Sequence, residues 1–232
     1  MDIRGLQKTS LIDYPGKVCC TIFVGGCNLR CLYCYNKDLV LEPETLPFFT
    51  KDEVLTFLQK RISFLDGVCI SGGEPTLQED LPAFIGEIKN LGLSVKLDTN
   101  GMKPGIISRL LEDKMLDFIA IDIKAPFEKY SLVTGVRVDT SALKETINIV
   151  KNNVVEHEFR TTFVPDLLDK EDIIKIAQAV GGCRRFVLQR FLSSSDLIDS
   201  SFNVHEYLPP EDIYEAVYLC LEYVKAVDLR GF

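Results

Sequence analysis

The sequence KVCCTIFVGGCNLRCLYC, residues 17–34, joins a β-rich apolar run to a loop that carries three cysteines. They are Cys27, Cys31 and Cys34, separated by three and then by two residues. A tetrahedral metal ion or an iron–sulfur cube has four corners to fill. The loop supplies three of these ligands, which raises the question of what occupies the fourth corner.

The apolar run is the first of a series of predicted strands that alternate with predicted helices. The first helix has helical apolar spacing, and Thr50 followed by Glu53 has the form of a capping box. Pro104 marks a later helix start and Gly92 a helix end. The predicted strands are residues 17–24, 66–71, 93–101, 116–126, 154–165 and 184–192, and the predicted helices are residues 50–64, 81–92, 103–114, 140–153, 169–182 and 209–227.

Strands that alternate with helices predict a parallel sheet with helices packed outside it. Six such units are too few for a full eight-fold barrel. We therefore expect an α/β fold, a partial (βα)6 TIM-like barrel with a parallel sheet. No internal repeat, low-complexity tract or linker divides the sequence, and residues 1–232 are expected to form one domain.

Polar or glycine-rich motifs follow every predicted strand. The cysteine loop follows the first strand, and the later strands lead into SGGEP, DTNG, DIKAP, RTTFVP and LQRF. In parallel α/β folds the chemistry gathers at the C-terminal ends of the strands. Six such motifs at the same rim predict one large site.

Composition and charge exclude several classes of function. The 26 basic and 34 acidic residues give a net charge of −8, and no long Lys/Arg run is present, which disfavours a nucleic-acid partner. The first residues lack an apolar signal segment, and no apolar stretch of about 18 residues occurs. We therefore expect a cytoplasmic protein with no transmembrane helix.

The chain has eight cysteines, and a disulfide framework is not the default for a cytosolic chain of this size. Cys69 and Cys220 lie in apolar runs and are expected to be small buried residues. A zinc site would need a fourth ligand, but the two histidines, His157 and His205, are distant from the loop in the sequence. Three thiolates can instead hold three irons of a [4Fe–4S] cluster and leave the fourth iron open.

With an aromatic residue, Tyr33, before its third cysteine, the motif resembles the signature of the radical S-adenosylmethionine (SAM) superfamily. The resemblance covers most of the chain and implies a [4Fe–4S] cluster whose open iron binds the amino and carboxylate groups of SAM. It implies reductive cleavage of SAM to a 5′-deoxyadenosyl radical, which abstracts a hydrogen atom. In this family a GGEP motif binds the methionine amino group, which assigns Gly72, Gly73 and Glu74 to the cofactor. Taken alone, GGEP could equally be a strand-to-helix turn.

The DTNG and DIK segments resemble those of glycyl-radical-enzyme activases. The resemblance implies that Asp98, Thr99 and Asp122 hold a monovalent cation beside the cofactor carboxylate. Related activases often have a His near the end of strand six, which is missing here, so that Gln189 or Arg190 would substitute for it. A structural salt bridge is an equal alternative for Arg160. The further residues implied at the cofactor are Tyr33, Asn100, Lys124, Arg160 and Gln189.

The flanks of the cysteine loop resemble the same branch. CLYCYNKDL is similar to an activase pattern, with Tyr35 where a His is common. SLIDYPGK resembles the activase D-G-P-G segment, with Tyr14 in place of the first Gly, and this implies that Asp13 lies near the glycine loop of the target protein. DYPG could equally be an ordinary turn. TSLIDYPGK most resembles anaerobic ribonucleoside-triphosphate reductase activating proteins.

The primary hypothesis is an activase that generates a glycyl radical on a partner enzyme, most similar to those that activate anaerobic ribonucleotide reductase. The family implies a flavodoxin or ferredoxin as electron donor. One alternative keeps the fold and cofactors but changes the substrate to a different protein or a small molecule. Another is a zinc-binding interaction domain with no enzymatic activity.

Overall fold

The computed structural model describes residues 1–192, 197–199 and 209–232. They contain one eight-stranded sheet in the order β1-β2-β3-β4-β5-β6-β7-β8. The first pair is antiparallel and every later pair is parallel. The strands are β1 (Ile3–Ser10), β2 (Cys19–Val24), β3 (Gly67–Gly72), β4 (Ser94–Thr99), β5 (Phe118–Asp122), β6 (Glu156–Phe163), β7 (Phe186–Arg190) and β8 (Val227–Arg230).

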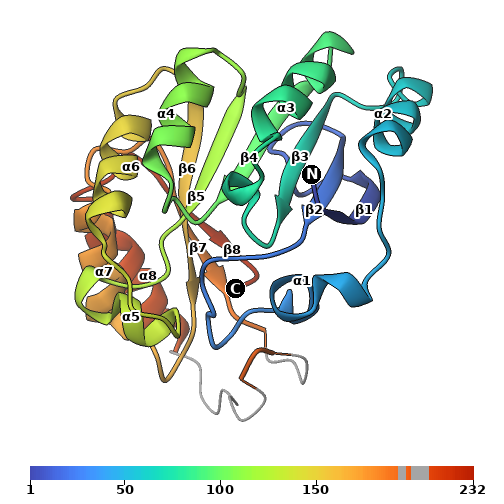
Figure 1. Cartoon of the computed structure of the whole chain (residues 1–232). Helices are drawn as coiled ribbons and strands as arrows, with labels where there is room; N and C mark the ends of the chain where they lie inside the picture. Colours follow the sequence, from blue (N-terminus) through green and yellow to red (C-terminus); the bar gives the residue numbers. More distant parts are fainter. Residues whose placement is uncertain (193–196, 200–208) are drawn as a thin grey trace.

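The helices lie on the outer face of this curved sheet, while the segment with the cysteines crosses one end of it (Figure 1). Six parallel strands are each followed by a helix, which confirms the predicted α/β fold. The helices are α1 (Lys37–Leu41), α2 (Lys51–Lys60), α3 (Leu81–Asn90), α4 (Pro104–Glu112), α5 (Tyr130–Val133), α6 (Ser141–Lys151), α7 (Lys170–Ala179) and α8 (Pro210–Cys220), with short 3₁₀ turns at Pro43–Thr45, Pro75–Leu77 and Phe127–Lys129.

Local signals explain where the helices begin and end. The predicted capping box is confirmed, because Thr50 accepts from the Glu53 amide while the Glu53 side chain accepts from the Thr50 amide. Pro104 is the first residue of α4, as predicted. Gly92 follows α3 with φ +82°, a left-handed conformation in which glycine is favoured.

Two strands were not predicted. β1 lacks regular alternation, because its middle residues are exposed or half-buried on an edge of the sheet. The last predicted helix, residues 209–227, began correctly but extended too far: α8 ends at Cys220, and the short β8 begins at Val227. The apolar residues continue beyond α8 because the turn that follows it packs Val224 against the core.

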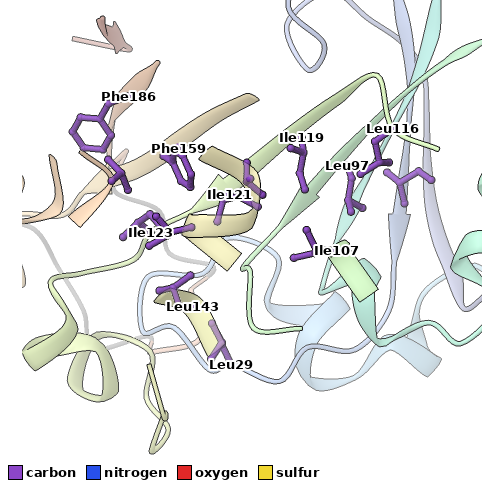
Figure 2. Close-up of a cluster of buried hydrophobic side chains, with 14 of the residues drawn as sticks. Leu29, Leu97, Ile107, Leu116, Ile119, Ile121, Ile123, Leu143, Phe159 and Phe186 are labelled. Atoms are coloured by element: carbon purple, nitrogen blue, oxygen red, sulfur yellow. The ribbon is translucent and has the colours of Figure 1, made fainter. Parts of the chain in front are cut away.

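The core lies between the sheet and its helices. Figure 2 shows Ile107 and Leu143 directed toward Leu97 and Ile121 of the sheet. Because strand side chains alternate between faces, the residues between these apolar positions point to the inner face. Near the strand starts this inner face carries a small buried cluster that includes Cys69 and Phe118. Toward the C-terminal ends of the strands it carries charged residues and leads into the motifs that the sequence placed at the rim. Among the residues described, no helix has the length and apolar character needed to cross a membrane.

Candidate active site

The cysteine loop follows β2 and is tied to three other parts of the chain. The amide of Gly26 donates to the Leu39 carbonyl of α1 at 2.7 Å. The amide of Arg30 donates to the Thr134 carbonyl, just after α5, at 2.9 Å. The side-chain amide of Asn36 donates to the carbonyl of Gly72 at 3.2 Å. These bonds hold the loop over the C-terminal end of the sheet through the chain's own contacts.

The three cysteines line one pocket of about 200 Å³ that is open to solvent at its mouth. Burial raises the pKa of all three thiols, that of Cys31 to about 12, although the ammonium of Lys124 opposes the shift. The amide of Leu29 donates to the Cys27 sulfur at 3.4 Å. Three soft thiolates fit an iron–sulfur cluster, and because each must lose its proton to bind iron, cluster assembly releases protons.

The glycines of GGEP allow the turn after β3 to lie directly on the start of the cysteine loop. The Gly73 amide donates to the Val24 carbonyl, and the Glu74 amide donates to the Gly26 carbonyl, both at 2.8 Å. Gly72 has φ +115°, and a Cβ on Gly73 would overlap the Gly26 carbonyl. The sequence predicted that these glycines let the backbone approach a ligand. The structure shows that they also let the GGEP turn pack against the backbone of residues 24–26.

Glu74 joins the ends of two strands. Its carboxylate accepts hydrogen bonds from the Thr99 hydroxyl at 2.6 Å and from the Asn100 amide at 2.8 Å. It also accepts from the amide and hydroxyl of Thr76. Desolvation raises the pKa of this 1% exposed side chain, while these hydrogen bonds act in the opposite direction. Glu74 therefore fixes the DTNG segment beside the GGEP turn, and direct contact with the cofactor stays a prediction.

The charged residues of DTNG and DIK form one connected group with Arg160. The guanidinium donates to Asp122 at 2.8 Å and to Asp98 at 3.2 Å, and Lys124 donates to the other oxygen of Asp122 at 3.0 Å. Burial alone would raise the pKa of Asp122, but the two cations hold it well below its usual range. Arg160 thus makes the structural salt bridge left open by the sequence, whereas its cofactor contact stays a prediction.

Two further predicted residues lie beside the cysteines. The side-chain amide of Asn100 donates to the Cys27 sulfur at 3.9 Å and to the side-chain oxygen of Asn28 at 2.8 Å. The hydroxyl of Tyr33 is buried in the wall of the pocket and has no hydrogen-bond partner within the described ranges. An unpaired buried hydroxyl is costly, so this group is well suited to a bound polar ligand.

The register of β7 shows which of Gln189 and Arg190, the two candidates for the missing His, points to the inner face of the sheet. Gln189 pairs with Thr162, which lines the pocket, and therefore points to the inner face. Arg190 pairs with Phe163 and borders a different, apolar cavity. Gln189 is thus the residue on the cofactor side, although it is not part of the pocket wall and its contact with the cofactor stays a prediction.

The structure does not bring Asp13 to this pocket. Because β1 is antiparallel to β2, the loop between them lies at the opposite end of the sheet from the cysteines. The carboxylate of Asp13 accepts from the Thr21 hydroxyl at 2.6 Å. The expected turn is present, since the Lys17 amide donates to the Tyr14 carbonyl and Gly16 has φ +72°. A role for Asp13 toward a partner stays a prediction.

The structure also shows where the cysteines and histidines outside the cysteine loop lie. Cys69 and Cys220 are fully buried, as expected. His157 is buried near the start of β6, so it lies at the opposite end of that strand from the cysteine loop. His205 lies outside the described residues. Within the described part of the chain, no group of three or more His, Cys, Asp or Glu side chains is arranged to hold a single metal ion.

Two contributors were missed from the sequence. Lys96 is buried on the inner face and pairs with Asp98, and its place on an inward strand position was the available signal.

Tyr35, at the position where a His is common, connects the cysteine loop to the end of β7. Its hydroxyl donates to the Leu192 carbonyl at 2.8 Å and accepts from the Leu192 amide at 2.7 Å, and its ring stacks on Phe191.

Tyr35→Phe should loosen this connection while keeping the ring stack. Loss of the two hydrogen bonds should lower the free energy of unfolding by about 1 kcal/mol, because the side chain is partly exposed. The cysteine loop should then open more often, and cluster absorbance should decay several-fold faster in air. Spectrophotometry of anaerobically reconstituted protein exposed to oxygen measures this rate. Equal decay in variant and wild type would contradict a protective role for Tyr35.

Comparisons with known proteins show which sequences this chain resembles. A family model described as "Radical SAM superfamily" matches residues 21–183. A Methanocaldococcus jannaschii protein named "Putative glycyl-radical enzyme activating enzyme" is 36% identical over 98% of this chain and 95% of its own length. The pyruvate formate-lyase-activating enzyme of Clostridium pasteurianum is 31% identical over 78% of this chain and 77% of its own length.

Solved structures share the fold. Streptococcus suis SuiB bound to the precursor peptide SuiA matches 91% of this chain with a TM-score of 0.71 and 17% identity. Methylornithine synthase matches 88% with a TM-score of 0.64 and 16% identity. The chain covers 48% of SuiB and 62% of methylornithine synthase, so the likeness concerns the shared core of these longer proteins.

Proposed function

The chain belongs to the radical SAM superfamily and, within it, to the glycyl-radical enzyme activating enzymes, and from this premise we propose that it forms a glycyl radical on an anaerobic ribonucleoside-triphosphate reductase. The observation that carries the proposal is the pocket where the three cysteines meet Lys124 and Asn100. The choice of partner is supported by TSLIDYPGK, residues 9–17, which resembles the activating proteins of that reductase.

The family uses a [4Fe–4S] cluster and SAM, and the chemistry of the pocket wall supports both, with three thiols for iron and an ammonium and an amide for the amino-acid part of SAM. Cys27, Cys31 and Cys34 would hold three irons, and the described loop offers no fourth thiol. When bound and reduced by one electron from a flavodoxin or ferredoxin, these cofactors supply the oxidising power to remove a hydrogen atom from a glycine Cα.

The chain's own residues would bind and orient the amino-acid part of SAM. Lys124 presents an ammonium in the pocket, where the charge of Asp122 keeps its pKa raised despite burial. Because Lys124 stays protonated, it can pair with a carboxylate. Tyr33 offers a buried hydroxyl with no partner among the described residues. The apolar side chains of Leu29 and Val40 complete the wall and limit the access of water.

A second candidate partner is pyruvate formate-lyase. The observation in its favour is the 31% identity to an activating enzyme of that name over 78% of this chain. Both candidates would use the same pocket, because the motifs at the rim serve the cofactors and not the target. Partner choice must therefore be tested with the two target enzymes in parallel.

The experiment mixes anaerobically reconstituted protein, a one-electron donor and SAM with each purified target enzyme. Electron paramagnetic resonance should show a glycyl radical doublet with the reductase and little or none with pyruvate formate-lyase. The matched control is a reductase in which the glycine that carries the radical is replaced by alanine. A doublet only with pyruvate formate-lyase would change the partner, and SAM cleavage without a doublet on either would support a different protein or a small molecule as substrate.

A further inference from the structure

Five charged side chains on the inner face form a continuous row, which we call the ion row: Lys96, Asp98, Arg160, Asp122 and Lys124. They come from β4, from the end of β5, from the segment directly after β5 and from the middle of β6, and neighbouring members are of opposite charge. Asp98 and Asp122 line the pocket of the cysteines, whereas Lys96 lies on the same strand face as Asp98, two residues nearer the start of β4.

Each carboxylate oxygen in the ion row already contacts a side-chain cation. Asp98 accepts from Lys96 with one oxygen and from Arg160 with the other. Asp122 accepts from Arg160 with one oxygen and from Lys124 with the other. The hydroxyl of Thr99 is also engaged, since it donates to Glu74 and accepts from the Gly101 amide.

This arrangement does not fit the monovalent cation that the resemblance assigned to Asp98, Thr99 and Asp122. A dissolved cation would have to displace ammonium or guanidinium groups from the carboxylates. The ion row holds three positive and two negative charges, so its own charges sum to plus one, and without Lys96 they would sum to zero. Two buried carboxylates border the ion row. Glu158 pairs with Arg230 and also lies 3.9 Å from Arg160. Glu74 lines the same pocket and accepts hydrogen bonds from neutral donors of Thr99 and Asn100.

Lys96 is the member of the ion row whose charge is not required to neutralise a buried partner. Its side chain is 1% exposed, and a lysine is rarely buried so completely without a specific partner. Besides Asp98, its ammonium contacts the Cys69 sulfur at 3.8 Å and lies 5.8 Å from the centroid of the Phe118 ring. Asp98 has Arg160 as a second cation, so Lys96 adds charge beyond what one carboxylate requires.

We propose that the ammonium of Lys96, acting through Asp98, takes the place of a dissolved monovalent cation at the SAM site. Lys96 is then a positioning residue: it fixes Asp98 and supplies the positive charge that favours the SAM carboxylate. This inference rests on the proposed function, because it concerns the binding of SAM. It makes SAM binding by this chain independent of Na⁺ and K⁺.

The test measures the SAM dissociation constant of the reconstituted wild type by anaerobic calorimetry. Titrations are run in KCl, in NaCl and in choline chloride at the same ionic strength, because choline is too large to enter a carboxylate site. The wild-type constant should change by less than about twofold between salts. Lys96→Met should bind SAM about 5–150-fold more weakly in choline chloride, the usual range of coupling between two bound species, and KCl should restore much of that loss.

Lys175→Met is the matched control, since Lys175 pairs with Glu128 on the exposed surface. It should bind SAM like the wild type in every salt. Lys96→Gln, with melting curves for all variants, provides a second replacement if Lys96→Met is unstable. A wild type that needs K⁺ for tight binding would overturn the inference, as would Lys96 variants without cation rescue. Failure of the wild type to bind SAM in any salt would instead reject the proposed function.

Discussion

Replacement of Cys27, Cys31 and Cys34 together by alanine should abolish the iron–sulfur absorbance of the reconstituted protein and reduce SAM cleavage to background. The three sulfurs line one pocket, and the loop that carries them is held by hydrogen bonds to α1, the GGEP turn and the segment after α5. Without thiolates no other soft donors of the loop can replace them. The loss should be complete, because the cluster needs every protein ligand that the loop offers.

Absorbance spectra, iron analysis and SAM cleavage assays under anaerobic conditions measure these changes. Cys220→Ala is the control, since this cysteine is buried in α8 and should change neither the cluster nor SAM cleavage. A triple variant that still assembles a full cluster would contradict the assignment of the site. Stoichiometric zinc without iron in the wild type would support the interaction-domain hypothesis instead.

Gly73→Ala should produce the second largest effect. The added Cβ would meet the carbonyl of Gly26, which is backbone and has no flexible end that can move away. Overpacking of this kind costs about 1–3 kcal/mol. The GGEP turn would separate from the cysteine loop, breaking the hydrogen bond from the Glu74 amide to Gly26. SAM affinity should fall by about tenfold or more, since each factor of ten corresponds to about 1.4 kcal/mol.

Gly86→Ala is the matched control for this substitution. Gly86 lies within α3, and a Cβ there meets no atom within 4 Å. The control should leave SAM affinity unchanged and stabilise the fold by about 0.4–1 kcal/mol, as alanine is favoured over glycine inside a helix. Calorimetric SAM binding and thermal melting provide both quantities. Wild-type affinity in Gly73→Ala would show that the turn is not held by this close approach.

The sequence predicted the six strand–helix units well because their interiors have clear periodic patterns and their ends carry capping signals. Thr50 and Pro104 are examples in which local chemistry alone decides the boundary. β1 and β8 escaped prediction for the opposite reason. They are edge strands whose half-buried residues lack a clean alternation, so pairing with a neighbour defines them more than their own side chains do.

The site could be predicted as far as strand direction allows. Residues after parallel strands come together at one rim, and the cysteines, GGEP, DTNG and DIK meet in one pocket as expected. Asp13 was different, because the antiparallel direction of β1 could not be known before that strand was recognised. The pairing of Lys96 with Asp98 also needed the structure, since alternation says which face a side chain takes but not whether its charge finds a partner.

The two outermost strands leave the sheet unclosed, as β1 pairs with β2 alone and β8 with β7 alone among the described strands. A closed barrel has its diameter set by the number and stagger of its strands. In this open sheet the number and stagger of the strands do not fix the distance between the two edges. Because no ladder of hydrogen bonds joins these edges in the described part of the chain, we expect them to move apart at a lower elastic energy than the wall of a closed barrel, which favours sideways entry of a bulky guest.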